Sequence, residues 1–210
     1  MAALLALAGC AAPYSGAEAV SSLSLSSREQ AMAAEATVTK RPLRLPQPEA
    51  AGDGIALTPH MAELRDALLE LSPTVDPQEA ARAAEMAFTY SGALKRAYAV
   101  EHGPLWHNTL VNAGQKPRGL CWHWAQDMQA RLEGAGFETL EVHRAIANSE
   151  NIRLEHSTAI LSAKGAPYTS GIVVDPWRNS GALFWAPVLE DARYVWRPRD
   201  EVLAQRRVEG

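Results

Sequence analysis

The sequence predicts an α+β fold in which helices come first and a sheet follows. Capping signals and apolar residues at helical spacing recur between residues 58 and 100. A further helical stretch runs from Cys121 to Glu133. After it, Gly134 and Gly136 break the chain, and short strand-like segments replace the helical pattern.

Composition limits the kinds of partner to be expected. The chain has 210 residues, of which 47% are hydrophobic and 21% charged, which is typical of one globular domain with a proper core. The net charge is −4, and no basic stripe is available to neutralise a phosphate backbone, so nucleic acid is not an expected partner. No apolar run approaches the ~20 residues that a membrane-spanning helix needs.

The N-terminal residues predict an exported protein. Residues 1–10 are apolar and end in Leu7-Ala8-Gly9-Cys10, which resembles the lipobox at which bacterial lipoprotein precursors are cleaved and lipidated on cysteine. No Lys or Arg precedes this run, and the alternative is a disordered apolar N-terminus. Residues 11–55 are rich in Ala, Ser, Glu and Pro and are expected to form a flexible tether to a folded domain at 56–210. The expected location is the cell envelope, as a periplasmic lipoprotein anchored to the membrane through Cys10 only.

Two helices are expected upstream of residue 100. Thr58 and Pro59 predict the start of the first. Asp76, Pro77 and Glu79 form a capping-box pattern for the second, which is expected to reach about Val100. His102 and His107 flank Pro104 and Trp106, and both are interpreted as loop residues.

Strand-like patterns follow the helix that begins at Cys121. They cover residues 137–146, 154–163 and 171–175, and a further short strand is expected near 192–196. In the second segment, alternation puts His156 on one face with Leu154, Thr158 and Ile160, which predicts that its ring points inward. Asp175-Pro176 alone would end the third strand in a turn.

Cys121 is the candidate nucleophile. The chain has two cysteines, and if Cys10 carries lipid, Cys121 has no intramolecular partner for a disulfide. A helix N-terminus favours the thiolate, and the amide of Cys121 itself could help to hold an oxyanion. Gly119 just before it would allow a close backbone approach.

A base and an orienting group can be assigned from the same patterns. His156 is the expected base, and a buried imidazole needs a partner for its second nitrogen. Asp175, at the end of the neighbouring apolar strand, could supply that carboxylate. Cys121, His156 and Asp175 would then act as nucleophile, base and orienting residue.

The segments Gly119-Leu120-Cys121-Trp122-His123-Trp124-Ala125, His156-Ser157-Thr158-Ala159 and Val174-Asp175-Pro176-Trp177 resemble the core pattern of the transglutaminase-like superfamily of papain-like cysteine enzymes. The resemblance covers about residues 119–177. It implies a nucleophile-bearing helix packed on a small antiparallel sheet, and it gives the three residues the same roles. Papain-type proteases also carry a glutamine six residues before the cysteine, so Gln115 is a candidate oxyanion donor.

The resulting functional hypothesis is an exported cysteine hydrolase that needs no cofactor. It would act on peptide, isopeptide or other amide bonds of proteins or peptidoglycan stems through a thioester, with hydrolysis favoured over cross-linking. Trp122, Trp124 and Trp177 would form a cleft wall for an extended chain.

Three alternatives remain open. Taken alone, Cys121 could be an inert thiol in the core, and Trp122, Trp124 and Trp177 could be core residues. Cys121, His123, His156 and Asp175 are zinc-ligand types, but a Cys-x-His pair on a helix does not converge on one ion, so no metal is expected. His123 lies on a different helix face from Cys121 and is interpreted as a structural or rim residue. The alternative from another class is an inactive envelope lipoprotein that uses a Trp-lined groove as a binding module.

Overall fold

The computed structural model describes residues 56–209. The predicted signal segment 1–10 with Cys10, and the predicted tether 11–55, lie outside the described residues.

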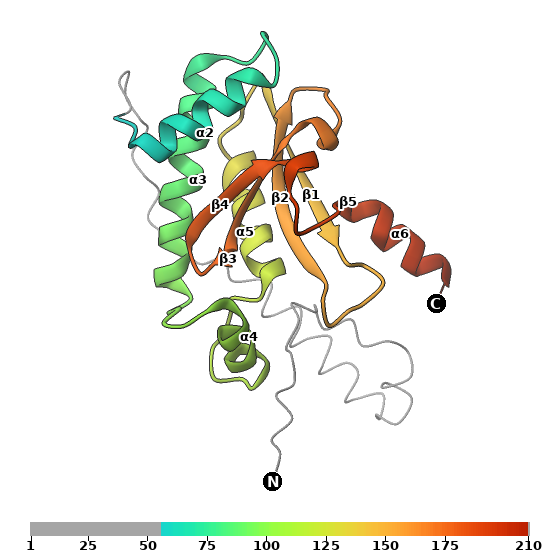
Figure 1. Cartoon of the computed structure of the whole chain (residues 1–210). Helices are drawn as coiled ribbons and strands as arrows, with labels where there is room; N and C mark the ends of the chain where they lie inside the picture. The colour runs from blue at the N-terminus through green and yellow to red at the C-terminus, as the bar shows by residue number, and fades with distance from the viewer. Residues whose placement is uncertain (1–55, 210) are drawn as a thin grey trace.

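Helices and strands occupy separate parts of the described chain, as expected for an α+β fold (Figure 1). The helices are α2 (Pro59–Glu70), α3 (Pro77–Ala97), α4 (Pro104–Asn112), α5 (Cys121–Glu133) and α6 (Arg199–Glu209). The strands are β1 (Leu140–Ala147), β2 (His156–Ala163), β3 (Ile172–Asn179), β4 (Ala182–Pro187) and β5 (Arg197–Pro198), with short 3-10 turns η1 (Tyr168–Ser170) and η2 (Val188–Glu190).

The strands form one antiparallel sheet in the order β4-β3-β2-β1-β5. Strand β2 is central, and Ala147 of β1 pairs with His156 at its start. Strand β5 pairs with β1 only at Ala145 and Ile146. The antiparallel sheet with a preceding helix layer agrees with the expected fold class.

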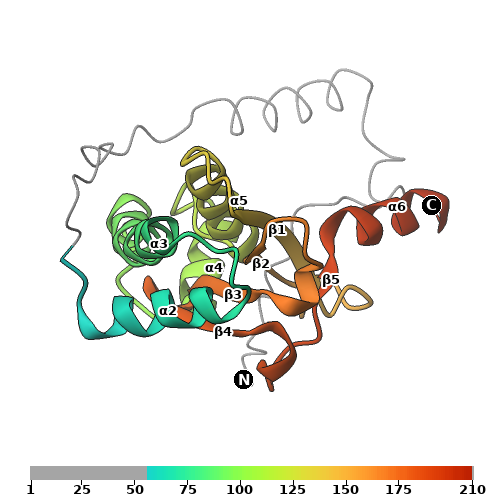
Figure 2. The same ribbon diagram turned by 90° about the horizontal axis from the view of Figure 1, so that it is seen from above.

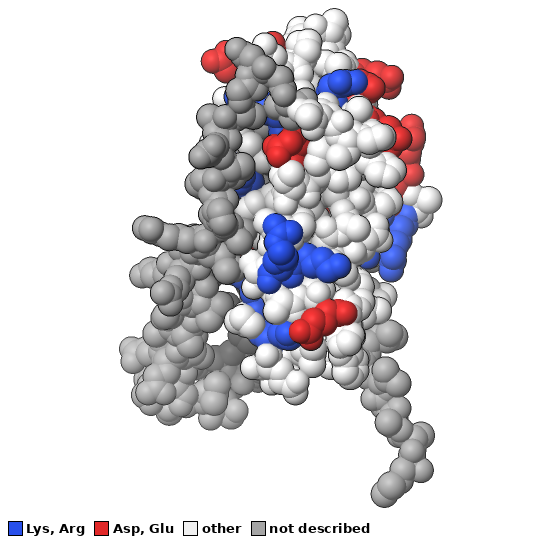
Figure 3. Space-filling view, turned by 90° about the vertical axis from the view of Figure 1, so that its left-hand side faces the viewer, with Lys and Arg blue, Asp and Glu red and all other residues white. Residues whose placement is uncertain are grey.

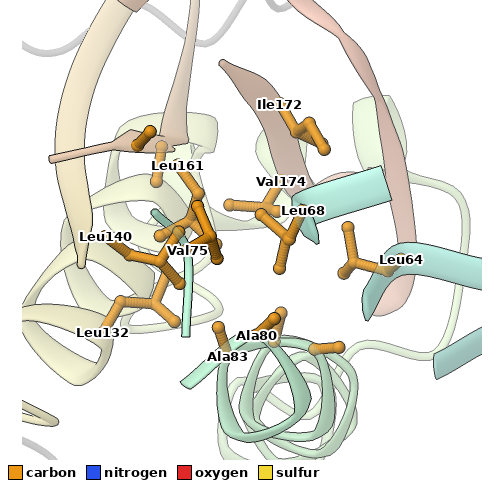
Figure 4. Close-up of a cluster of buried hydrophobic side chains, with 14 of the residues drawn as sticks. Leu64, Leu68, Val75, Ala80, Ala83, Leu132, Leu140, Leu161, Ile172 and Val174 are labelled. Carbon is orange, nitrogen blue, oxygen red and sulfur yellow. The ribbon is translucent and has the colours of Figure 1, made fainter. Parts of the chain in front are cut away.

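Helices α2, α3 and α5 cover one face of the sheet (Figures 1 and 2). Leucines of α2 and α5 meet small alanines of α3 and the branched side chains of β2 and β3 there (Figure 4). The alanines allow the helix backbone to approach closely, so apolar area is removed from water without large side chains. The labelled core residues of this cluster are Leu64, Leu68, Val75, Ala80, Ala83, Leu132, Leu140, Leu161, Ile172 and Val174.

The other face of the sheet is covered by η1, η2 and the segment before β5. Val188 and Trp196 pack there on Ala145, Ile160 and Val173. Every residue of β2 is therefore buried, on both faces of the strand. His156 lies on this second face, because it alternates with Ile160 rather than with Leu161.

The two predicted helix starts are confirmed. The Thr58 hydroxyl accepts from the amide of Met61, and Asp76 accepts from the amides of Gln78 and Glu79. The capping box at Asp76 is incomplete, however. The Glu79 carboxylate turns away to accept from the amides of Glu138 and Thr139 and from the Thr139 hydroxyl, and so ties α3 to the chain before β1.

Some predicted boundaries are wrong. Leu154 is 53% exposed and precedes β2, which begins at His156. Strand β3 continues through Pro176, because a bulge between Asp175 and Asn179 removes the need for a ladder donor at the proline. The strand expected at 192–196 instead forms at Arg197–Pro198.

Three elements were missed altogether. Helix α4 contains His107, which was interpreted as a loop residue, and Gly103-Pro104 opens this helix. Strand β4 is only partly buried, and α6 has a weakly apolar sequence with one buried residue, Val202, so neither carries a strong periodic signal. Helix α6 extends from the β5 edge, away from the other helices (Figure 2).

The described surface shows charges of both signs. On the face shown in Figure 3, lysine and arginine side chains form small groups among uncharged residues, and some of them touch acidic side chains. None of the described helices combines the length and apolar character needed to cross a membrane.

Candidate active site

Cys121 is the first residue of α5, and the turn that delivers it is tightly fixed. Gly119 has φ +128°, and a Cβ there would lie 2.2 Å from Nε2 of the buried His107. That same nitrogen lies 2.9 Å from the carbonyl oxygen of Arg118. Only glycine fits both this conformation and this contact. The close backbone approach expected at Gly119 is therefore present.

An ion pair between Arg118 and Asp127 also fixes the turn before Cys121. Arg118 donates from Nε and Nη2 to the two carboxylate oxygens of Asp127, at 3.0 and 2.5 Å. The Tyr98 hydroxyl donates to the same carboxylate at 2.5 Å. The loop before Cys121 is thereby tied to the second turn of α5 and to the end of α3.

His123 is a structural residue of this turn. Its Nδ1 accepts from the backbone amides of Gly119 and Leu120, at 3.2 and 3.1 Å, so the ring is neutral and caps the start of α5. Burial, and then the charge of Arg118, lower the pKa of His123 to about 3. A neutral ring is the state that the two accepted bonds require.

His156 and Asp175 form a buried pair. Nε2 of His156 lies 2.6 Å from Oδ2 of Asp175, and the two side chains are each only 1% exposed. The other ring nitrogen, Nδ1, is buried and has no partner at ordinary hydrogen-bond distance within the described chain. The hydrogen bonding and the charge of Cys121 both raise the pKa of the imidazole, so the Cys121 side chain is close to this ring.

The pair favours a charged imidazolium. Burial alone would lower the pKa of His156, but the charge and hydrogen bond of Asp175, and then the contribution of Cys121, raise it to about 9. Burial likewise would raise the pKa of Asp175, but His156 and Arg178 hold it below the usual range. A carboxylate that accepts several hydrogen bonds stays ionised even when it is sealed from water.

Aromatic rings hold the imidazole in place. Trp177 and Tyr194 each have ring centroids 4.7 Å from that of His156, and Trp196 lies at 5.6 Å. Their π faces stabilise an imidazolium and restrict its rotation. The indole N–H of Trp177 donates to Oδ1 of Asn108 at 3.1 Å, so α4 supports this ring.

Arg178 and Asp191 fix both the carboxylate and the aromatic rings. Arg178 donates from Nε to Asp175 at 3.2 Å and from its two terminal nitrogens to Asp191 at 3.0 and 2.7 Å. Asp191 also accepts from the indole of Trp196 at 3.0 Å. One guanidinium thus connects the residue that orients His156 to the segment that covers it. Neither residue was singled out from the sequence, although Arg178 directly follows the segment Val174-Asp175-Pro176-Trp177 that carried the resemblance.

The sulfur is closed off from solvent. Cys121 is 0% exposed, and its Sγ lies 3.9 Å from the carbonyl oxygen of Glu155, the residue before His156. The Glu155 side chain is paired with Arg206 of α6, which also donates to the carbonyl oxygen of Ser149 at 2.8 Å. Helix α6 therefore holds the β1–β2 connection against the thiol.

The structure brings together the three predicted catalytic residues, but not all of the predicted accessory ones. Gln115 is exposed in the turn after α4, and its side chain makes no hydrogen bond to Cys121, His156 or Asp175 in the described part of the chain. The six-residue separation between Gln115 and Cys121 in the sequence does not indicate the direction in which the turn carries the Gln115 side chain.

The three predicted cleft tryptophans have different surroundings. Trp124 is 1% exposed, packs edge-on to Tyr98 and donates to the Gly119 carbonyl, so it is a core residue rather than a cleft wall. Trp177 is 6% exposed and lies on His156. Trp122 is partly exposed and stacks on His123, and its buried Nε1 lacks a hydrogen-bond partner among residues 56–209.

Within residues 56–209, no group of three or more His, Cys, Asp or Glu side chains is arranged to hold a metal ion. No protein-family model, curated protein or solved structure matches this chain. The chemistry of the site must therefore be inferred from its own residues.

Proposed function

We propose that the protein is a cysteine hydrolase of transglutaminase-like type, with Cys121 as nucleophile, His156 as base and Asp175 as orienting residue. The observation that carries the proposal is the buried His156–Asp175 pair, whose remaining ring nitrogen Nδ1 has no other described partner and has the Cys121 sulfur as its neighbour. A purely structural histidine would have both nitrogens satisfied.

The proposed resting state is an ion pair of thiolate and imidazolium. An imidazole whose pKa lies near 9 is protonated at neutral pH, and the N-terminus of α5 stabilises a negative sulfur. Asp175 keeps Nε2 occupied, so Nδ1 is the atom that exchanges a proton with the sulfur.

The proposed reaction is acyl transfer to water. The thiolate attacks the carbonyl carbon of an amide, and a carbon–sulfur bond forms while the carbonyl oxygen takes the negative charge. As the carbon–nitrogen bond breaks, the imidazolium gives its proton to the leaving amine. Water then attacks the thioester while His156 takes a proton from it, the acid leaves, and the ion pair is restored.

The proposed substrates are peptide or isopeptide bonds of proteins or of peptidoglycan stems, and the proposed location is the cell envelope, through the lipobox-like Cys10. Both rest on the sequence of residues 1–10 and on the resemblance at residues 119–177. Since Cys121 is 0% exposed, substrate must displace part of its cover before the sulfur can react.

Thiol reactivity tests this proposal. Iodoacetamide modification of Cys121 is followed by peptide mass spectrometry, so that Cys10 is counted separately, between pH 5 and 10. We expect the rate at pH 6 to stay within about threefold of its value at pH 9, because the thiolate persists, whereas a free thiol with a pKa of about 8.5 would lose over 100-fold.

Two variants complete this test. His156→Gln should restore the profile of an ordinary thiol, because it removes the counter-charge. Cys121→Ala should remove the modification at this position. An unchanged profile in His156→Gln would contradict the proposal.

The second candidate is an inactive binding module that retains the fold. The complete burial of Cys121 favours it, because a sealed sulfur makes no contact with substrate. This candidate predicts a profile with a midpoint near that of an ordinary thiol, about 8.5, in the wild-type protein.

A further inference from the structure

A cavity of about 360 Å³ lies at the outer edge of β1. Strand β5 pairs with β1 only at Ala145 and Ile146, so the cavity opens where β5 stops and α6 begins. We call it the β1-edge cavity. Its polar lining residues are Gln129, His143, Arg144, Tyr168, Arg199 and Asp200.

Arg144 is a partly buried cation with incomplete pairing. Its terminal nitrogens donate to Gln129 at 3.3 Å and to Ser157 at 2.9 Å, both neutral acceptors. Its Nε is buried without a partner, and within residues 56–209 the guanidinium forms no ion pair. A buried charge in this position is costly unless an anion joins it.

The remaining charges around the cavity favour an anion as well. Arg199 lines it from the first turn of α6, whose N-terminal end adds partial positive charge. Burial, and then the charge of Arg199, lower the pKa of Arg144 to about 10, as expected for two cations that face each other. His143 is bonded to the Ser162 hydroxyl at 2.8 Å, and burial lowers its pKa, so it adds no charge at neutral pH. Asp200, the one acid in the lining, lies 3.6 Å from the Arg199 guanidinium, but its side chain is 96% exposed, so solvent screens this pair and it offsets the positive charge only weakly.

The cavity adjoins the candidate active site through Arg144. Ser157, which accepts from Arg144, is the residue directly after His156. The charge of Cys121 also acts on Arg144 and raises its pKa. An anion held at the guanidinium would therefore lie beside the catalytic residues rather than on a remote surface.

We propose that the β1-edge cavity is a carboxylate-binding subsite, with Arg144 as the residue that binds the anion and Arg199 as its support. This deepens the proposed hydrolase function and rests on it: the substrate class is a peptide with a free carboxylate close to the bond that is cleaved. A guanidinium fork matches a planar carboxylate through two parallel hydrogen bonds. Each terminal nitrogen of Arg144 gives one proton to a neutral acceptor and has a second proton for such a pair.

Binding of a matched peptide pair tests the proposal. N-acetyl-dialanine and its C-terminal amide differ only in the carboxylate, and their dissociation constants are measured by NMR titration at constant ionic strength. The full chain carrying Cys121→Ala is used, so that turnover does not interfere. We expect the acid to bind at least about tenfold more tightly than the amide.

Variants assign the effect to the cavity. Arg144→Gln should remove the preference for the acid, and Arg199→Gln should reduce it several-fold. Arg207→Gln, an exposed change of the same charge on α6, should leave it intact. Should Arg144→Gln fail to fold, as judged by circular dichroism, the Arg199→Gln result decides.

Several outcomes would overturn the subsite. They are equal binding of acid and amide, no binding of the acid, or a preference that survives both variants. If inorganic phosphate binds with the same dependence on Arg144 while the peptide pair shows no difference, the cavity holds free anions and the substrate inference fails. Because binding is measured without the thiol, a carboxylate preference combined with an ordinary thiol profile would keep the subsite and refute the hydrolase.

Discussion

Replacing Asp175 by Asn should remove most of the pH dependence of stability that His156 creates. In the folded protein the pKa of His156 is about 9, against an ordinary value of 6.5. Below pH 6.5 both the folded and the unfolded states bind the proton, and the stabilisation is fully present. Between these values His156 holds its proton in the folded state but not in the unfolded state, so its contribution to the free energy of unfolding falls as the pH rises.

The magnitude follows from the shift. A difference of about 2.5 pKa units corresponds to about 3 kcal/mol, lost between pH 6 and pH 10. In Asp175→Asn the amide can still accept from the backbone amides of Trp177 and Arg178, but the charge that holds the imidazolium is gone. Burial then dominates, and the His156 pKa should fall below its ordinary value.

Urea unfolding followed by tryptophan fluorescence at pH 6, 8 and 10 measures this difference. The comparison is made in the Cys121→Ala background, because in the wild type the proposed thiolate has already lost the proton that the unfolded thiol keeps up to about pH 8.5, which offsets the proton held by His156. The stability of Cys121→Ala should decrease as the pH rises. An equal decrease after Asp175→Asn is added to it would refute the reasoning, since it would place the titrating group elsewhere.

Two further perturbations test the elements around the sulfur. Gly119→Ala should lower the free energy of unfolding by about 2–4 kcal/mol, because the new methyl group overlaps the buried His107 imidazole and the backbone has φ +128°. Gly103→Ala, which has open space around its Cβ, should change the free energy of unfolding by less than about 1 kcal/mol in the same urea assay. Arg206→Ala should speed iodoacetamide modification of Cys121 several-fold, because it frees the connection that covers the thiol, and Arg207→Ala on the same helix should not. Equal rates in those two α6 variants would mean that the cover opens elsewhere.

The helices and the central strands follow from local signals. Thr58 and Asp76 bring their own capping groups, and the stripe from Cys121 to Leu132 has the helical period, so these elements could be located without tertiary information. The prediction that Cys121, His156 and Asp175 meet rested on their order and spacing, on the strand patterns around His156 and Asp175, and on the resemblance at residues 119–177.

The elements and hydrogen bonds that were not predicted depend on contacts between distant segments. Strand β4 and helix α6 bury little, so their positions come from the sheet edge and from pairs such as Arg206 with Glu155. Glu79 was expected to complete the capping box of its own helix. Its carboxylate instead accepts from the amides of Glu138 and Thr139 and from the Thr139 hydroxyl. Competition between a local and a distant partner is decided by geometry that one sequence does not display.

The sequence by itself determined the chemistry available to the protein: one thiol at a helix start, and an imidazole and a carboxylate on successive strands. Only the tertiary structure decided the protonation of these groups and the exposure of the sulfur. Only packing brings Trp177, Tyr194 and Trp196 around His156, and only folding places Arg178 where it can bind Asp175 and Asp191 at once. The physical reason is that burial and charge act through space, so a pKa or a closed sulfur depends on neighbours that are far apart in the chain.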